Sequence, residues 1–158
     1  MQSLFPAAEA LAAAAGEKEP GAEHLIIASL EFQEGSARRV FERVGADPDR
    51  FRDGVADQHA AALRQLGIED DATAIDKQIP PPPQRPSGPY RSAPSAREVF
   101  ADVVKLVKRD KSQLAGAYIL LAVSQIEDGP TARALESMGI DRSELVAAAQ
   151  AEVDALNA

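Results

Sequence analysis

With 45% hydrophobic and 27% charged residues among its 158, the chain suits one ordinary globular domain or two small ones packed together. Its net charge of −8 argues against a nucleic-acid partner, because phosphate binding needs clustered lysine and arginine side chains. The chain has no cysteine, which excludes disulfides and thiolate metal sites and fits a cytoplasmic location, and no apolar run is long enough to predict a membrane partner.

Apolar residues at helical spacing predict four helices in the first part of the chain. The pair Pro20–Gly21 separates the first helix from the second, and Gly45 has the position expected of a C-terminal glycine. Asp47 followed by Pro48 is typical of a helix start. The predicted helices cover residues 3–15, 22–33, 36–44 and 48–66.

The composition changes at residues 67–94. An acidic stretch, Glu69–Asp71, is followed by a run of prolines that begins at Pro80 and cannot be helical. Such a run favours the extended polyproline II conformation, which serves either as a ligand for SH3-like or WW-like domains or as a stiff spacer. We interpret it as a spacer, because it lies where two parts of the chain must be joined.

The last part of the chain carries clearer helix starts. Ser95 with Glu98, and Asp141 with Glu144, have the spacing of a capping box, in which two side chains satisfy free backbone N–H groups. Four further helices are predicted over residues 95–110, 116–127, 130–138 and 142–156.

A repeat relates the two parts. The stretch from Gly35 to Asp47 returns from Gly129 to Asp141 at a constant offset of 94 residues, and an apolar run precedes each copy. A fixed offset indicates one helical unit used twice. We therefore predict an all-α chain with a first four-helix unit at 1–66, a linker at 67–94 and a second unit at 95–158.

The segment from Gly21 to Leu30 reads Gly-Ala-Glu-His-Leu-Ile-Ile-Ala-Ser-Leu, and the motifs Glu34–Ala37 and Val44–Asp47 follow it. These motifs resemble the N-terminal domain of the Clp ATPases, above all the ClpC type, and the second copy, from Gly116, fits less closely. The resemblance implies an eight-helix pseudo-dimer that receives substrates and adaptor proteins for an unfoldase and its protease.

No Gly-x-x-x-x-Gly-Lys-[Ser/Thr] motif is present in the sequence, so ATP hydrolysis is not expected. The resemblance then leaves two possibilities, an excised fragment or a stand-alone relative without the ATPase modules. Neither the sequence nor the resemblance implies a cofactor, a metal or a catalytic residue, and we predict that the chain is not an enzyme.

The resemblance also implies a site for phosphoarginine at Glu23, with Ala22 and His24 beside it. A helix N-terminus offers N–H groups to a phosphate, and a carboxylate can accept a guanidinium. Alternatively, Glu23 only complements the helix dipole, and His24 forms a hydrogen bond within the chain. The family's threonine is Ala22 here, and its glutamate is Ala117 in the second copy. We therefore predict phosphoarginine binding that is reduced or absent.

A second surface implied by the resemblance is the one to which cyclomarin-type cyclic peptides bind in ClpC. It corresponds here to Phe5, Tyr90, Pro94, Arg97 and Phe100. An apolar patch at these residues would form a peptide-binding groove. The alternative is that Phe5 and Phe100 are core residues of their helices.

Together these features predict a binding module for peptide segments, adaptor proteins or cyclic peptide antibiotics, which could act as a decoy in a proteolysis pathway. The alternative is a scaffold that docks onto a Clp ATPase or its adaptor through acidic faces or the Pro80–Pro89 segment, without a small-ligand pocket.

Overall fold

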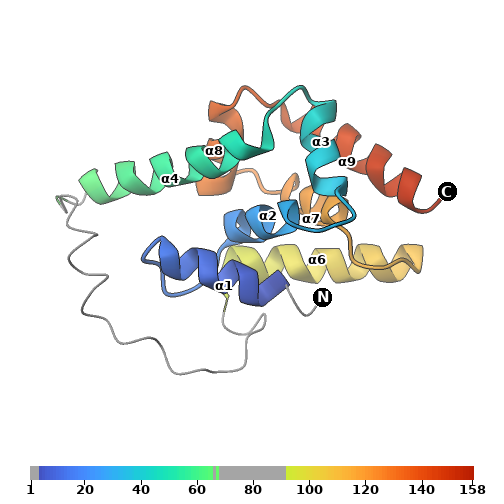
Figure 1. Ribbon diagram of the computed structural model, residues 1–158, viewed down its shortest axis with the longest axis horizontal. Helices are drawn as coiled ribbons and strands as arrows, with labels where there is room; N and C mark the ends of the chain where they lie inside the picture. The colour runs from blue at the N-terminus through green and yellow to red at the C-terminus, as the bar shows by residue number, and fades with distance from the viewer. Residues whose placement is uncertain (1–3, 66, 68–91) are drawn as a thin grey trace.

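The computed structural model describes residues 4–65, 67 and 92–158, and within them it contains eight helices and no strand (Figure 1). The predicted all-α class is confirmed. Helices of the first repeat are α1 (Leu4–Ala14), α2 (Ala22–Leu30), α3 (Ser36–Arg43) and α4 (Pro48–Gln65); those of the second are α6 (Pro94–Asp110), α7 (Gly116–Val123), α8 (Pro130–Ser137) and α9 (Arg142–Leu156).

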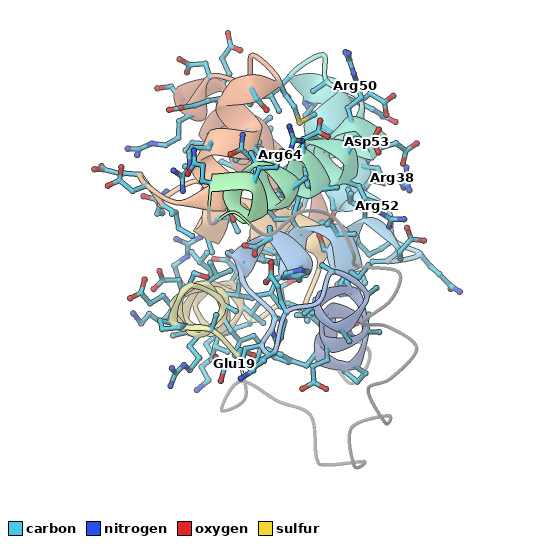
Figure 2. The ribbon with its side chains drawn as sticks, turned by 90° about the vertical axis from the view of Figure 1, so that its left-hand side faces the viewer. Glu19, Arg38, Arg50, Arg52, Asp53 and Arg64 are labelled. Carbon is cyan, nitrogen blue, oxygen red and sulfur yellow. The ribbon has the colours of Figure 1, made fainter. Side chains whose placement is uncertain are left out.

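The helices form three layers. Helices α1 and α6 lie below, α2 and α7 lie in the middle, and α3, α4, α8 and α9 lie above (Figures 1 and 2). No helix in the described part of the chain is both long and apolar enough to cross a membrane. Residues 68–91, which include the whole Pro80–Pro89 segment, lie outside the described residues, so the predicted unit boundaries stay predictions.

Helices α2 and α7 form the centre of the molecule, and every residue of both is buried. A helix that is apolar on all sides is stable only when neighbours cover all of it. Gly116, the first residue of α7, allows the closest approach, because a Cβ there would lie 2.5 Å from the Cβ of Ala37 in α3. The two repeats therefore share one core.

The upper layer interleaves the repeats. Helix α3 packs on α9, and α4 packs on α8, so each pair joins one helix from each repeat. The offset of 94 residues relates the first residues of α2 and α7, of α3 and α8, and of α4 and α9. Only the first helices depart from it, since α1 begins at Leu4 and α6 begins 90 residues later, at Pro94.

Two predicted helices end early. Helix α2 ends at Leu30 instead of residue 33, and α7 ends at Val123 instead of residue 127. At both ends the backbone turns through tighter hydrogen bonds to the third residue back, and the hydroxyls of Ser29 and Ser124 donate to carbonyls three residues earlier, each at 2.6 Å. Such local bonds compete with continuation of the helix.

The predicted capping box at Ser95 is wrong, whereas the predicted N-cap at Asp141 is confirmed. Helix α6 begins one residue early, at Pro94, so Ser95 lies inside its first turn and accepts a hydrogen bond from the N–H of Ala22 in α2 at 3.2 Å. Asp141 does cap α9, because its carboxylate accepts from the N–H groups of Ser143 and Glu144.

A buried charge links the two repeats where α3 crosses α9. The carboxylate of Glu152, in α9, accepts hydrogen bonds from Nε of Arg39 at 2.8 Å and Nε of Arg43 at 2.6 Å, both in α3. Burial alone would favour the protonated carboxyl, but the hydrogen bonds and charges of the arginines outweigh it and hold the pKa of Glu152 below its ordinary value. The ion pair therefore stabilises the fold only while Glu152 is ionised.

We expect Glu152→Gln to lower the free energy of unfolding at neutral pH by about 1.5–3 kcal/mol, the range for hydrogen bonds to a charged group. Because the pKa of Glu152 is lowered on folding, the difference from wild type should be complete above pH ~5 and should shrink as the pH falls toward 3. Urea unfolding at a series of pH values measures both effects.

The matched control is Glu127→Gln, which removes an ion pair with Arg142. This pair is exposed, since the side chain of Glu127 is 74% exposed. This variant should change stability by less than about 0.5 kcal/mol. An equal loss in the two variants, or a loss in Glu152→Gln that does not depend on pH, would show that the buried charge is not the cause.

Candidate functional site

The carboxylate of Glu23 faces the protein interior. Glu23 is only 8% exposed. Its Oε2 accepts a hydrogen bond from the hydroxyl of Thr131, in α8 of the other repeat, at 3.2 Å. The side chain folds back over Gly21, where an added Cβ would lie 2.6 Å from Oε1. The carboxylate predicted to receive a guanidinium is therefore engaged between the repeats.

His24 forms a hydrogen bond within the chain, which is one of the two roles predicted for it. Its Nδ1 accepts from the N–H of Gly21 at 3.0 Å, so the neutral ring carries its proton on Nε2. That nitrogen lies 4.0 Å from a carboxylate oxygen of Glu17. The N–H of Ala22, the next group at this helix start, donates to Ser95. Ala22, Glu23 and His24 do lie together, as predicted for one site. However, the N–H of Ala22, the carboxylate of Glu23 and Nδ1 of His24 each have a partner in the protein.

Potential ligand atoms of Glu17, Glu23 and His24 lie within 4.8 Å of one another. Glu23 already accepts from Thr131, and Nδ1 of His24 already accepts from Gly21. A metal ion bound at these groups would have to displace such contacts, so the cluster does not indicate a metal centre.

Side chains of the first repeat accept hydrogen bonds from the free N–H groups at the start of α7. One carboxylate oxygen of Glu34 accepts from the N–H of Gly116 at 2.7 Å, and the other accepts from the N–H of Ser36 at 2.7 Å. The hydroxyl of Ser36 accepts in turn from the N–H of Ala117 at 2.9 Å. Glu34 therefore bridges the N-termini of α3 and α7, with its negative charge where a bound phosphate would lie.

The second copy also differs at the position of the histidine. Tyr118 is fully buried, and its hydroxyl donates to Asp110 at 3.2 Å and accepts from Asn157 at 3.0 Å. This hydrogen-bond chain ties α7 to the ends of α6 and α9. The α7 helix start thus lacks both the acidic group and the histidine that α2 has.

The lower layer carries the predicted hydrophobic surface. The rings of Phe5 and Phe100 meet edge to face, with centroids 4.8 Å apart, and join α1 to α6. Phe5 is a core residue at 5% exposure, whereas Phe100 is half-buried. Pro94 and Arg97 are exposed and precede Phe100 at three-residue spacing, so the three residues share one face of α6. Tyr90 lies outside the described residues.

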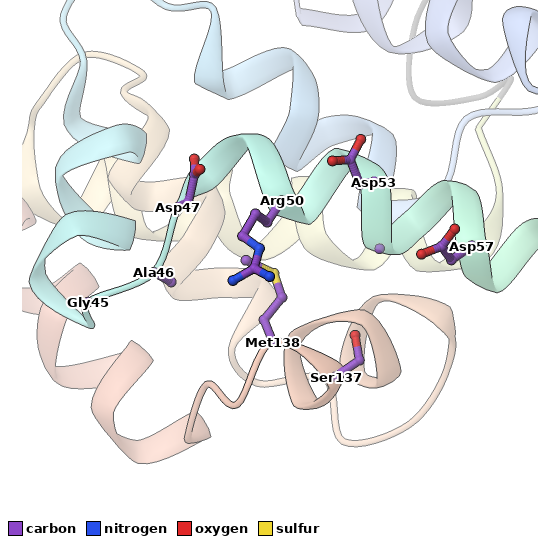
Figure 3. A pocket seen from close by; sticks show the side chains of 9 residues that line it. Gly45, Ala46, Asp47, Arg50, Asp53, Asp57, Ser137 and Met138 are labelled. Atoms are coloured by element: carbon purple, nitrogen blue, oxygen red, sulfur yellow. The ribbon is translucent and has the colours of Figure 1, made fainter.

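A polar pocket of about 380 Å³ lies where α4 crosses α8 (Figure 3). The guanidinium of Arg50 extends over Met138, and Asp53 and Asp57 lie further along α4. Gly54 brings α4 close to α8, since an added Cβ would lie 3.8 Å from Oγ of Ser137. These residues contain no nucleophile paired with a base, and the pocket does not indicate a catalytic centre.

Sequence reasoning missed Glu34, Ser95 and Thr131 as partners of the two helix starts. Each comes from a distant part of the chain, so no local motif identifies it. The repeat contains one usable signal. Glu34 and Ser36 flank Gly35, whereas Asp128 and Pro130 flank the equivalent Gly129, which indicates that this turn has a different task in each copy.

Comparison with known proteins agrees with this architecture. A family model described as the Clp repeat (R) N-terminal domain matches residues 1–138. The fold is similar to the crystal structure of the N-terminal domain of the chaperone ClpD from Arabidopsis thaliana, with a TM-score of 0.58 and 19% identity over 96% of this chain and 92% of that one. No curated protein matches the chain in sequence.

We expect Glu34→Ala to create an anion site at the start of α7, because it frees the N–H groups of Gly116 and Ser36. The variant should lose about 1–2 kcal/mol of stability, and inorganic phosphate should restore part of that loss. Thermal unfolding with and without phosphate, at constant ionic strength, measures this.

Glu136→Ala, which removes an exposed carboxylate of α8, is the control and should show no specific response to phosphate. A rise of the wild-type melting temperature as large as that of Glu34→Ala would mean that Glu34 does not occupy the anion position.

Proposed function

Because the chain belongs to the Clp N-terminal domain family, we propose that it is a non-enzymatic binding module of a Clp proteolysis system. It captures peptide segments, adaptor proteins or cyclomarin-type cyclic peptides at the surface formed by Pro94, Arg97 and Phe100, with Phe5 as its support. As a decoy, it would compete with the N-terminal domain of a Clp ATPase for such ligands.

The observation that carries this proposal is the Phe5–Phe100 pair beside two exposed residues of α6. An edge-to-face pair contributes about 0.5–1.5 kcal/mol beyond its buried area and holds the ring of Phe100 in one orientation. A half-buried aromatic ring with a fixed orientation loses little conformational entropy when a ligand packs on it. Arg97 adds a cation at the edge of this apolar surface, where it can donate to peptide carbonyls or carboxylates.

Phosphoarginine contributes little to this proposed function. At α2, the carboxylate of Glu23 accepts from Thr131, and the N–H of Ala22 donates to Ser95. At α7, the carboxylate of Glu34 takes the place of an anion. Binding would require the ligand to break these hydrogen bonds, each worth about 0.5–1.5 kcal/mol net, before making its own.

We expect a cyclomarin-type cyclic peptide to bind the wild-type chain, and Phe100→Ala to weaken binding by about tenfold or more, because the ring is the main apolar contact. Arg97→Ala replaces an exposed residue and should weaken binding while leaving stability unchanged. Calorimetric titration gives both affinities, and thermal unfolding checks the fold of each variant.

Free phosphoarginine should bind feebly or not at all in the same titration, and Glu23→Ala should leave the cyclic peptide unaffected. Strong phosphoarginine binding that Glu23→Ala abolishes would contradict the assignment of the lower surface. If neither ligand binds, the scaffold alternative, in which the chain docks on a Clp ATPase or an adaptor, replaces the proposal.

A further inference from the structure

An apolar cleft of about 310 Å³ lies in the second repeat, between the end of α7, helix α8 and the start of α9. It is separate from the lower-layer surface of α1 and α6. Its apolar lining consists mainly of Val123, Ile126, Leu135, Ile140 and Leu145. A cavity about half this size, in an engineered protein with an apolar lining, accepts benzene, so this cleft has room for an aromatic ring.

The repeat offset identifies what occupies the same place in the first copy. Leu135 and Leu145 correspond to Phe41 and Phe51, which lie 94 residues earlier. Both rings are fully buried, and their centroids lie 5.8 Å apart. Leu135 retains 8% exposure, in contrast to 0% for Phe41, whereas Leu145 is fully buried, as Phe51 is. At the position of Leu135, the first repeat thus has a phenyl ring where the second repeat has a smaller side chain that lines the cleft.

The cover over this region also differs between the copies. In the first repeat, Nε of Arg38 donates to the carbonyl of Leu30 at 3.0 Å, and its guanidinium lies 3.6 Å from Asp49. Figure 2 shows Arg38 near Arg52 at one edge of the upper layer. The equivalent of Arg38 is Ala132, whose side chain has no donor and covers little. Three lining residues are larger than their first-repeat equivalents, since Val123, Ile140 and Arg142 stand where the first repeat has Ser29, Ala46 and Pro48.

The rim of the cleft is acidic. Three exposed carboxylates, those of Glu127, Glu136 and Asp141, and one guanidinium, that of Arg142, line it. Arg142 is already paired with Glu127 at 3.2 Å. Since the whole chain carries a net charge of −8, the field at the rim attracts cations.

We infer that this cleft is a second binding site, which takes the aromatic side chain of a protein segment whose phenylalanine is flanked by basic residues. The ring packs beside Leu135, at the place that corresponds to the ring of Phe41 in the first repeat, and the flanking cations face the acidic rim. The site goes beyond the proposed function, because it lies on α7–α9 and uses none of the residues of the lower surface.

Nuclear magnetic resonance titration of the isotope-labelled chain tests this directly. The probe is a short peptide with one phenylalanine between two lysines, and the comparison peptide has alanine in place of phenylalanine. We expect amide shifts at Ala132 and Leu135, with affinity at least about tenfold higher for the phenylalanine peptide.

Two variants close the cleft as the first repeat does. Leu135→Phe fills it, and Ala132→Arg covers it from a half-buried position that the core does not depend on. Both should abolish the preference for phenylalanine, whereas Phe100→Ala should leave it intact. Equal binding of the two peptides, retention of the preference in Ala132→Arg, or its loss in Phe100→Ala would each overturn the inference.

Discussion

The complete burial of α2 and α7 is the constraint on which the rest of the structure depends. A buried helix start has N–H groups without intrahelical partners, and leaving such a group unpaired away from water costs about 1–3 kcal/mol. The protein satisfies these groups with side chains from elsewhere, namely Ser95 at α2, and Glu34 and Ser36 at α7. These hydrogen bonds to the buried helix starts therefore fix how α6 packs on α2 and how the first repeat packs on the second.

The same solution decides which ligands the helix starts can accept. A phosphate is favoured at a helix N-terminus because N–H groups and the dipole both point at it. In this chain, the carboxylate of Glu34 supplies that negative charge from within, and it bridges two helices at once. Stability and anion binding thus compete for the same donors. The Phe5–Phe100 pair in the lower layer takes no part in this competition.

The sequence was sufficient to predict what depends on local pattern. The eight helices, the offset of 94 residues and the cap at Asp141 could be read from spacing and residue type. Ser95 was misread, because Pro94 starts the helix one residue early and frees the hydroxyl for a contact 73 residues away. The complete burial of α2 could not be predicted from its own residues, because it results from packing against six other helices, α1, α3, α4, α6, α7 and α8. Contacts such as Thr131 with Glu23 join distant segments and have no local signature.

Duplication gives the chain an internal reference, and the differences between the copies separate structure from function. Where α3 crosses α9, Arg39 and Arg43 hold Glu152; where α8 crosses α4, the equivalents are Arg133, Ser137 and Gln58, which cannot form the same ion triplet. The first repeat likewise fills its upper core with Phe41 and Phe51, which the second replaces with leucines. In both cases the first repeat supplies the larger side chains, the two arginines of α3 and the two phenylalanines, and the packing around them is tighter. Since one shared core holds both copies and a small domain unfolds as one cooperative unit, an interaction at one crossing stabilises the whole fold. The second repeat can therefore keep open pockets without unfolding, and binding sites are expected on that side of the molecule.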